Sequence, residues 1–195
     1  MKRFFDVVLS SVGLILTSPL LLAIAAWVRF SSPGSIFYRG TRAGRLGRPF
    51  RIFKFRTMVV NADKIGGPST SADDPRITRA GHLLRRYKLD ELPQLLNVLK
   101  GDMSLVGPRP EVMAEVALYS AQEKHLLDVR PGITDWASLE FRNEGEILRG
   151  SADPHQAYRE RIRPEKVRLG LDYVKRHSLW TDVWILLLTL KSLRS

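Results

Sequence analysis

A long apolar stretch near the N-terminus places the strongest constraint on how this chain can fold. Residues 7–28 carry no charged side chain. As a helix they would extend about 33 Å, just enough to cross a hydrocarbon core of roughly 30 Å. Basic residues flank the stretch on both sides, with Lys2 and Arg3 before it and Arg29 after it. Because positive charge favours the cytoplasmic side, we expect both ends on the same side of a membrane.

Ser18 and Pro19 lie near the middle of this stretch. Pro19 removes one backbone hydrogen bond and clashes with the preceding turn, and the Ser18 hydroxyl can satisfy the carbonyl that is freed. The residues therefore predict a helix-break-helix arm, residues 1–30, that enters one leaflet and turns back. A kinked helix that spans the bilayer and a cleaved signal peptide are the alternatives. A strongly basic start of the mature chain disfavours the signal peptide.

The net charge of +11 lies entirely in the first half of the chain. Residues 1–100 hold 17 Lys and Arg against 6 Asp and Glu, whereas residues 101–195 hold 14 of each sign. A basic collar beside an apolar segment favours anionic lipid headgroups and phosphorylated substrates. Nucleic acid is the competing partner, but the sequence has no helix-turn-helix, zinc finger or aromatic-rich RNA motif. The chain has no cysteine, which excludes disulfides and thiolate metal sites.

The rest of the chain, residues 31–195, is long enough for a single domain with its own hydrophobic core. Two short strand-like segments, residues 36–38 and 50–55, are separated by glycines and predict a β-hairpin. Hydrophobic spacing and capping residues predict helices at residues 77–88, 92–100, 111–128, 164–177 and 183–190. The predicted fold class is therefore α+β, dominated by helices, with a small hairpin and amphipathic helices at a membrane interface.

The last helix is too short to cross a bilayer, so it either packs on the core or lies at the membrane interface. Trp180 and Trp184 suit an interfacial position, and two buried core tryptophans are the alternative. Ser178 or Thr181 can cap this helix.

Residues 85–110 combine two adjacent carboxylates, a short apolar helix and an arginine between two prolines. Asp90 is a plausible N-cap, and Gly101 is a plausible stop for the helix that follows. Asp90 and Glu91 then lie at the positive end of a helix dipole, which attracts anions. Helix capping alone would account for the pair. Otherwise, since neighbours on a helix point about 100° apart, one carboxylate would act as nucleophile or base and the other would hold a metal.

Arg109 stands in the sequence Gly107-Pro108-Arg109-Pro110. The prolines restrict the loop, and a stiff loop that presents a guanidinium suits bidentate phosphate binding. Further upstream, Lys54 and Arg56 alternate with phenylalanines, which places both basic side chains on one face of a strand.

The stretch LDELPQLLNVLKGDMSLVGPRP, with KFRTM before it and RPGIT after it, resembles the monotopic phosphoglycosyl transferases of bacteria, also called the bacterial sugar transferase family. The resemblance covers nearly the whole chain. It implies a re-entrant membrane arm bent at Ser18 and Pro19, with the catalytic domain on the cytoplasmic face of the bacterial inner membrane. It also implies that Lys54, in KFRTM, belongs to the active site, with Arg56 a weaker candidate, and that Arg85 faces the substrate phosphate.

The resemblance also supplies a reaction. The implied donor is a UDP-sugar and the implied acceptor is a polyprenol phosphate such as undecaprenyl phosphate. Asp90 would attack the sugar-linked phosphate and release UMP, and the lipid phosphate would then displace the aspartyl group. Lys54, Arg85 and Arg109 would hold the phosphate oxygens, while Mg²⁺ held by Glu91 and Asp90 would screen the approach of one anion to another.

Two other functions stay open from the sequence: a non-enzymatic basic module that binds a membrane surface, and a phosphatase that uses the same aspartyl intermediate. The sugar is also open. Many relatives carry Gly-Trp-Ala-Gln after RPGIT, where this chain has Asp135-Trp136-Ala137-Ser138. The carboxylates of residues 142–146 are interpreted as surface charges. The oligomeric state is undetermined, and a homo-oligomer is compatible with the sequence.

Overall fold

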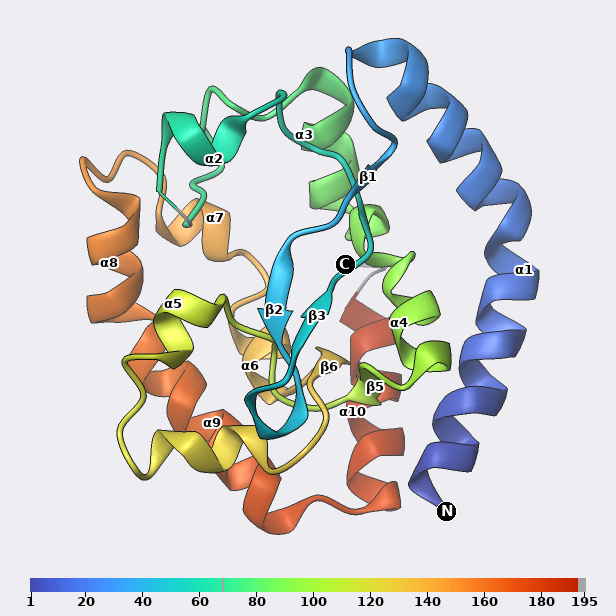
Figure 1. The fold of residues 1–195 in the computed structure, drawn as a ribbon, viewed down its shortest axis with the longest axis vertical. Helices are drawn as coiled ribbons and strands as arrows, with labels where there is room; N and C mark the ends of the chain where they lie inside the picture. Colours follow the sequence, from blue (N-terminus) through green and yellow to red (C-terminus); the bar gives the residue numbers. More distant parts are fainter. Residues whose placement is uncertain (68, 193–195) are drawn as a thin grey trace.

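The computed structural model of the protein describes residues 1–67 and 69–192, and helices dominate it (Figure 1). The α-helices are α1 (Lys2–Ser31), α2 (Ala62–Ile65), α3 (Arg79–Arg86), α4 (Gln94–Lys100), α5 (Met113–Val116), α6 (Trp136–Glu140), α7 (Glu144–Ile147), α8 (Pro154–Arg161), α9 (Arg163–Arg176) and α10 (Leu179–Ser192). Short 3₁₀ helices are η1 (Arg45–Gly47), η2 (Leu89–Glu91) and η3 (Glu123–Leu127). The predicted helix-dominated fold with little sheet is confirmed.

The predicted hairpin is present as two consecutive antiparallel pairs of strands. Strands β1 (Phe37–Tyr38) and β4 (Lys54–Phe55) form the outer pair, and β2 (Thr41–Ala43) and β3 (Pro49–Arg51) form the inner pair. Phe37 stacks on Phe55, with ring centroids 5.4 Å apart. The hairpin thereby presents Lys54 near its base.

A buried amide joins this hairpin to α4. The side chain of Asn97 accepts a hydrogen bond from the backbone N–H of Phe53 (2.8 Å) and donates one to the carbonyl of Arg51 (2.9 Å). It also donates to the Asp102 carboxylate at 3.2 Å. Since Phe53 immediately precedes Lys54, Asn97 fixes the position of that lysine relative to α4.

The centre of the domain is a parallel pair of short strands, β5 (Ser104–Val106) and β6 (Gly132–Thr134). Glycine is needed at Gly132, the first residue of β6, because a Cβ atom there would lie 2.1 Å from the backbone nitrogen of Gly107, the residue that follows β5. The main hydrophobic core surrounds these strands and consists of Ile52, Val98, Met103, Leu105, Val106, Tyr173 and Ile185. The loop after β5, which contains Arg109, therefore starts from the well-packed centre of the domain.

The apolar arm is one uninterrupted helix, so the break predicted at Ser18 and Pro19 is absent. The hydroxyl of Ser18 donates a hydrogen bond to the carbonyl of Ile15 at 2.8 Å. This is the carbonyl that Pro19, which lacks an N–H, leaves without its usual partner. Because the serine replaces that bond, as the sequence suggested, the helix continues through the proline. It is long and apolar enough to cross a membrane.

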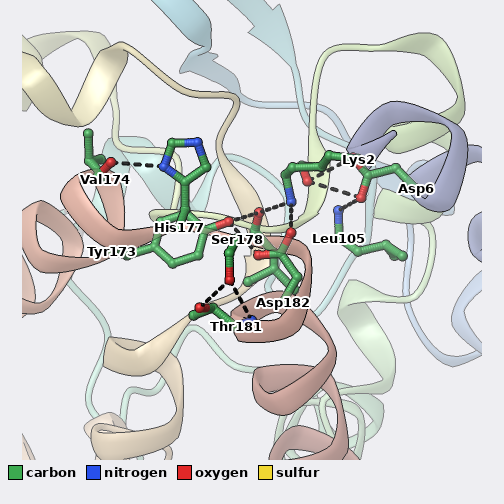
Figure 2. A network of polar contacts seen from close by, with 11 residues as sticks. Lys2, Asp6, Leu105, Tyr173, Val174, His177, Ser178, Thr181 and Asp182 are labelled. Carbon is green, nitrogen blue, oxygen red and sulfur yellow. Dashed lines mark hydrogen bonds and ion pairs between the residues drawn. The ribbon is translucent and has the colours of Figure 1, made fainter.

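α1 lies along one side of the molecule beside α4 (Figure 1). A buried polar network fixes its first turns to the domain (Figure 2). The Lys2 ammonium pairs with Asp182 of α10 at 2.5 Å, and the Tyr173 hydroxyl donates to the same carboxylate at 2.7 Å. Asp6, only 2% exposed, accepts a hydrogen bond from the backbone N–H of Leu105 at 3.1 Å.

The other end of α1 also contacts the domain. Its residues Ile24 and Val28 pack against Phe55 and Leu84. The guanidinium of Arg56 donates to the carbonyls of Val28 (3.1 Å) and of Ser32 (2.8 Å), where it satisfies groups left free at the helix end. Arg56 therefore holds the arm in place, which corrects the expectation that it shares the active site with Lys54.

The single helix predicted for residues 111–128 is wrong. Two short segments, α5 and η3, take its place, with Ser120 between them. The Ser120 hydroxyl accepts from the backbone N–H of Glu123 (3.2 Å), and the Glu123 carboxylate accepts from the backbone N–H of Ser120 (2.7 Å). This reciprocal capping box starts a new helical segment.

α9 and α10 follow the sequence expectations closely. The Ser178 hydroxyl accepts a hydrogen bond from the backbone N–H of Thr181 at 3.1 Å, so Ser178 caps the last helix. Trp180 and Trp184 are 84% and 57% exposed, respectively. The alternative of two buried core tryptophans is therefore excluded.

Candidate active site

Asp90 is the second residue of η2, which begins directly after Lys88, a residue whose backbone is in the left-handed region with φ of 55°. Its side chain does not cap α4, which begins at Gln94 after Pro93, so the predicted N-cap role is wrong. Asp90 is only 7% exposed. Within residues 1–67 and 69–192, no side chain or backbone group forms a hydrogen bond or an ion pair with its carboxylate. Asp90 is thus a buried carboxylate that is free to react.

Glu91 is held by two cations from distant parts of the chain. Its Oε1 atom lies 2.8 Å from Lys54 Nζ and 2.5 Å from Arg109 Nη2, and its Oε2 atom lies 3.2 Å from Arg109 Nη1. The arginine contact is bidentate, a geometry that orients both groups. The structure therefore brings together Lys54, Glu91 and Arg109, three of the residues selected from the sequence.

The two adjacent carboxylates have opposite electrostatic environments. Burial raises the pKa of Asp90, and the negative charge of Glu91 raises it further. Burial also raises the pKa of Glu91, but the charges and hydrogen bonds of Arg109 and Lys54 outweigh it and hold that pKa well below the usual range. Neighbouring groups with pKa values moved in opposite directions are typical of sites where two carboxylates have different roles.

Arg85 and Lys88 bring more positive charge toward Asp90. Burial lowers the pKa of Arg85, while the charges of Asp90 and Asp74 oppose this effect. Burial and the charge of Arg109 lower the pKa of Lys88. Neither cation has a carboxylate within 4 Å in the described part of the chain. Both cations are thus available to an anionic ligand. The sequence analysis did not select Lys88, which stands out in the structure by its left-handed backbone.

The environment of Arg109 contains two acids that the sequence analysis did not assign to the site. The charge of Glu91 raises the pKa of Arg109, and after the opposing effect of burial, Glu144 and Asp135 raise it further. Glu144, expected at the surface, also forms an ion pair with Lys166. These acids come from α7 and from the residue after β6, and only the tertiary fold places them beside the arginine.

The carboxylate pair is the natural place for the Mg²⁺ that the resemblance implies. Among the described residues, no group of three or more His, Cys, Asp or Glu side chains is arranged to hold a metal ion. Mg²⁺ commonly binds through one or two carboxylates together with substrate phosphates and water. The unpaired Asp90 carboxylate fits this kind of site. Glu91 Oε1 already accepts from Lys54 and Arg109, so Glu91 would contribute the remaining lone pair of Oε2.

Comparison with known proteins identifies the family to which this protein belongs. A model of the bacterial sugar transferase family matches the chain over residues 1–195, and the protein belongs to this family of transferases. A UDP-glucose:undecaprenyl-phosphate glucose-1-phosphate transferase from Escherichia coli strain K12 is 40% identical over 97% of the chain. A protein of the same name from Caulobacter vibrioides is 41% identical over 98% of the chain. A UDP-N-acetylgalactosamine-undecaprenyl-phosphate N-acetylgalactosaminephosphotransferase from Aeromonas hydrophila is 38% identical over 98%.

The chain matches only part of some of these relatives. It spans 39% of the Escherichia coli protein and 43% of the Aeromonas protein, but 69% of the Caulobacter protein. The relatives also differ in the sugar that their names specify. Family membership thus identifies the class of enzyme, and it leaves the donor sugar of this protein to be determined.

Proposed function

We propose that the protein transfers a phospho-sugar from a UDP-sugar to undecaprenyl phosphate, with release of UMP, as the first membrane step of a glycan pathway. The observation that carries the proposal is the environment of Asp90, a buried carboxylate without a partner among the described residues, surrounded by Lys54, Arg85 and Lys88. The names of the relatives, which specify undecaprenyl phosphate as acceptor, support the same reaction.

In the first half-reaction, a carboxylate oxygen of Asp90 attacks the phosphorus that is linked to the sugar. An aspartyl O–P bond forms, the P–O bond to the UMP phosphate breaks, and UMP leaves with the electron pair. The raised pKa of Asp90 indicates a more basic carboxylate than usual, which favours attack once the group is ionised. This step requires no proton transfer to the leaving phosphate.

In the second half-reaction, an oxygen of undecaprenyl phosphate attacks the same phosphorus. The bond between that phosphorus and the Asp90 oxygen breaks, which regenerates the carboxylate and gives a polyprenyl diphosphate sugar. Two sequential displacements through one covalent intermediate predict ping-pong kinetics.

The surrounding cations position the reacting phosphates. Phosphoryl transfer depends mainly on positioning and on neutralisation of charge. Lys54 and Arg109 are held in place by Glu91, and Arg85 approaches from α3, so the three cations can contact phosphate oxygens on different sides. When bound, Mg²⁺ on the Asp90 and Glu91 carboxylates would neutralise part of the phosphate charge.

A monotopic placement of α1, with residues 1–30 as the membrane arm and residues 31–195 as a catalytic domain on the cytoplasmic face of the inner membrane, is part of the proposal. It is supported by the contacts at both ends of the helix. Lys2 and Asp6 bond to α10 and β5, and Val28 packs on Phe55 and is capped by Arg56. A helix that crossed the bilayer would separate its two ends by the membrane thickness and could not keep both sets of contacts with one domain. The exposed tryptophans of α10 suit the headgroup region of the same leaflet.

The reaction is tested by measuring UMP release from a panel of UDP-sugars, with and without undecaprenyl phosphate. We expect release that requires Mg²⁺, stops after one equivalent without acceptor, and disappears in Asp90→Asn. The exposed Asp63→Asn serves as the matched control and should retain activity. Continued turnover without acceptor would identify a phosphatase, and absence of UMP release with every donor would favour the non-enzymatic membrane module.

The placement of the arm is tested by cysteine labelling, which the natural absence of cysteine makes clean. Phe4 is 76% exposed and Val60 is 52% exposed, so cysteines at these positions should react. We expect a membrane-impermeant reagent to label both positions from the same side of the membrane. Labelling from opposite sides would exclude the monotopic placement.

A further inference from the structure

A cavity of about 40 Å³ lies beside Arg109. Its walls come from the loop after β5 and from the regions of α5, η3, α6, α8 and α9, and they include Tyr119, Asp135 and Ala137. A second cavity of about 20 Å³ shares Arg109 and Tyr119. One enclosed water needs about 10–15 Å³ of such space, so the larger cavity has room for a few hydroxyl groups but not for a whole hexose ring.

Almost every charged side chain that lines the larger cavity has a partner within the protein. The pairs are Arg109 with Glu91, Glu115 with Arg159, Arg163 with Glu123, Lys166 with Glu144, and Glu111 with the Tyr158 hydroxyl. Asp135 differs from these groups. It is 3% exposed, and its Oδ1 atom accepts one hydrogen bond, from the backbone N–H of Ser138 at 2.7 Å.

The second oxygen of Asp135 has no donor. Throughout residues 1–67 and 69–192, nothing donates a hydrogen bond to Asp135 Oδ2, and no cation lies within 4 Å of the carboxylate. The Tyr119 hydroxyl is likewise without a hydrogen bond in the described part of the chain. Neither atom is fully enclosed, and Tyr119 is only half-buried, so both atoms stay accessible to a ligand at the cavity wall. A carboxylate oxygen and a hydroxyl that are accessible but have no partner in the protein can form hydrogen bonds with a bound ligand.

We propose that this cavity binds adjacent hydroxyl groups of the sugar-nucleotide donor, with Asp135 Oδ2 as their acceptor and Tyr119 as a second polar contact. The proposal rests on the function proposed above, in which Arg109 holds a donor phosphate. Since Arg109 also lines the cavity, hydroxyl groups one sugar ring away from that phosphate can enter it.

Hydroxyl groups fit this lining better than the other parts of the donor do. A phosphate would be repelled by the Asp135 charge, whereas a carboxylate accepts hydrogen bonds from hydroxyl groups. The apolar neighbours Ala137, Leu126 and Val167 can contact the C–H groups of the same ring. Both the sugar and the ribose of a UDP-sugar carry adjacent hydroxyls, and the experiment below separates the two.

The test compares Asp135→Asn with wild type. Asparagine keeps the side-chain size and the oxygen that caps α6, so we expect the variant to fold, and a thermal melt checks this. Asp153→Asn is the matched control, because Asp153 caps α8 in the same way and does not line the cavity. Dissociation constants are measured by calorimetry in nanodiscs, with Asp90→Asn in every protein so that the donor is not consumed.

The donors are the UDP-sugar that binds wild type most tightly among UDP-glucose, UDP-galactose and UDP-N-acetylgalactosamine, its singly deoxygenated sugar analogues, and its 2′-deoxyuridine analogue. We expect Asp135→Asn to weaken binding of the complete donor about 10- to 100-fold, the effect of one hydrogen bond to a charged group. For an analogue that lacks the bound hydroxyl, the variant should lose no further affinity. A sugar analogue with this behaviour places the sugar in the cavity, and the 2′-deoxyuridine analogue places the ribose there.

An equal loss of affinity with every donor, or a loss no larger than that of Asp153→Asn, would overturn the proposal. The outcome is distinguishable from failure of the proposed function. If the donor binds with the expected dependence on Asp135 but protein with an intact Asp90 releases no UMP, the transferase reaction is refuted and the hydroxyl subsite stands. If UMP is released and the dependence is absent, the reverse holds.

Discussion

Replacing Asn97 by alanine should disturb both the stability and the site, because this one side chain connects α4 to the strand that carries Lys54. The residue is fully buried, and its amide makes three hydrogen bonds, with Phe53, Arg51 and Asp102. At about 1 kcal/mol for each bond, the loss is about 3 kcal/mol. For a chain of this size, each kcal/mol lowers the melting temperature by roughly 2–4 °C, so we expect a decrease of roughly 6–12 °C.

The assay is a thermal melt of the protein in nanodiscs, followed by UMP release at a temperature where the variant is folded. Without Asn97, Lys54 loses its fixed distance to Glu91, so we expect the turnover number to fall even in the folded variant. Asn143→Ala is the control, since Asn143 is exposed and its side chain forms no capping bond at the start of α7. If Asn97→Ala melts at the same temperature as Asn143→Ala, the proposed connection through the buried amide is refuted.

Three further predictions follow from the electrostatics. The rate should fall as the pH falls through the raised pKa of Asp90, at a pH above the ordinary value of about 3.9, because attack requires the ionised carboxylate. In Glu91→Gln this acidic limb should move to lower pH, since the neighbouring negative charge is removed; pH profiles of UMP release check this, and an unmoved limb contradicts it. Asp90→Asn should raise the melting temperature at neutral pH. A carboxyl whose pKa is raised in the folded state lowers the stability of the protein as the pH rises from its unfolded pKa to its folded pKa, and asparagine removes this effect. Thermal melts at several pH values should show that this gain in melting temperature becomes smaller toward acidic pH. A melting temperature of Asp90→Asn below that of wild type at neutral pH would contradict the raised pKa of Asp90. Lys2→Met should destabilise the protein by about 1–3 kcal/mol, because Asp182 stays buried after losing its cation. In a double-mutant cycle with Asp182→Asn the two effects should not add, and full additivity would show that the pair is not coupled.

Local sequence signals account for the parts of the fold that could be predicted. The glycine-separated strands of the hairpin, the stop of α4 at Gly101 and the cap of α10 at Ser178 each depend on residues close together in the chain. Two local signals lead to predictions that differ from the structure. Ser120 and Glu123 form a capping box that divides the segment expected as one helix, and Ser18 repairs the gap that Pro19 leaves in α1.

The candidate site was predictable only in part. Asp90 and Glu91 stand out as an adjacent pair in the sequence, but the contacts of Glu91 with Lys54 and Arg109 join segments far apart in the chain. Arg109 stands out by its place between two prolines, whereas the resemblance to a family indicates Lys54. Residue spacing alone could not predict that both contact Glu91. Asp135 stands out in the sequence only as a departure from the Gly-Trp-Ala-Gln of many relatives. Its free oxygen could not be predicted, because it follows from how α6 packs beside the loop after β5.

Arg56 also lies elsewhere than the periodicity of its strand predicts. Its alternation with Phe55 places it on one strand face with Lys54, but the strand ends at Phe55 and the side chain turns to the end of α1 instead. Strand periodicity does not apply beyond the last paired residue. Lys54 therefore lies in the candidate site, whereas Arg56 holds the end of α1.

The central claim is that the Asp90 carboxylate becomes covalently attached to the phospho-sugar. Mass spectrometry of the protein after incubation with its UDP-sugar and Mg²⁺, without lipid acceptor, tests this claim most directly. We predict a phospho-sugar adduct on the peptide that contains Asp90, which disappears when undecaprenyl phosphate is added. Turnover that continues at the normal rate while Asp90 stays unmodified, or an adduct on a different side chain, would contradict the account.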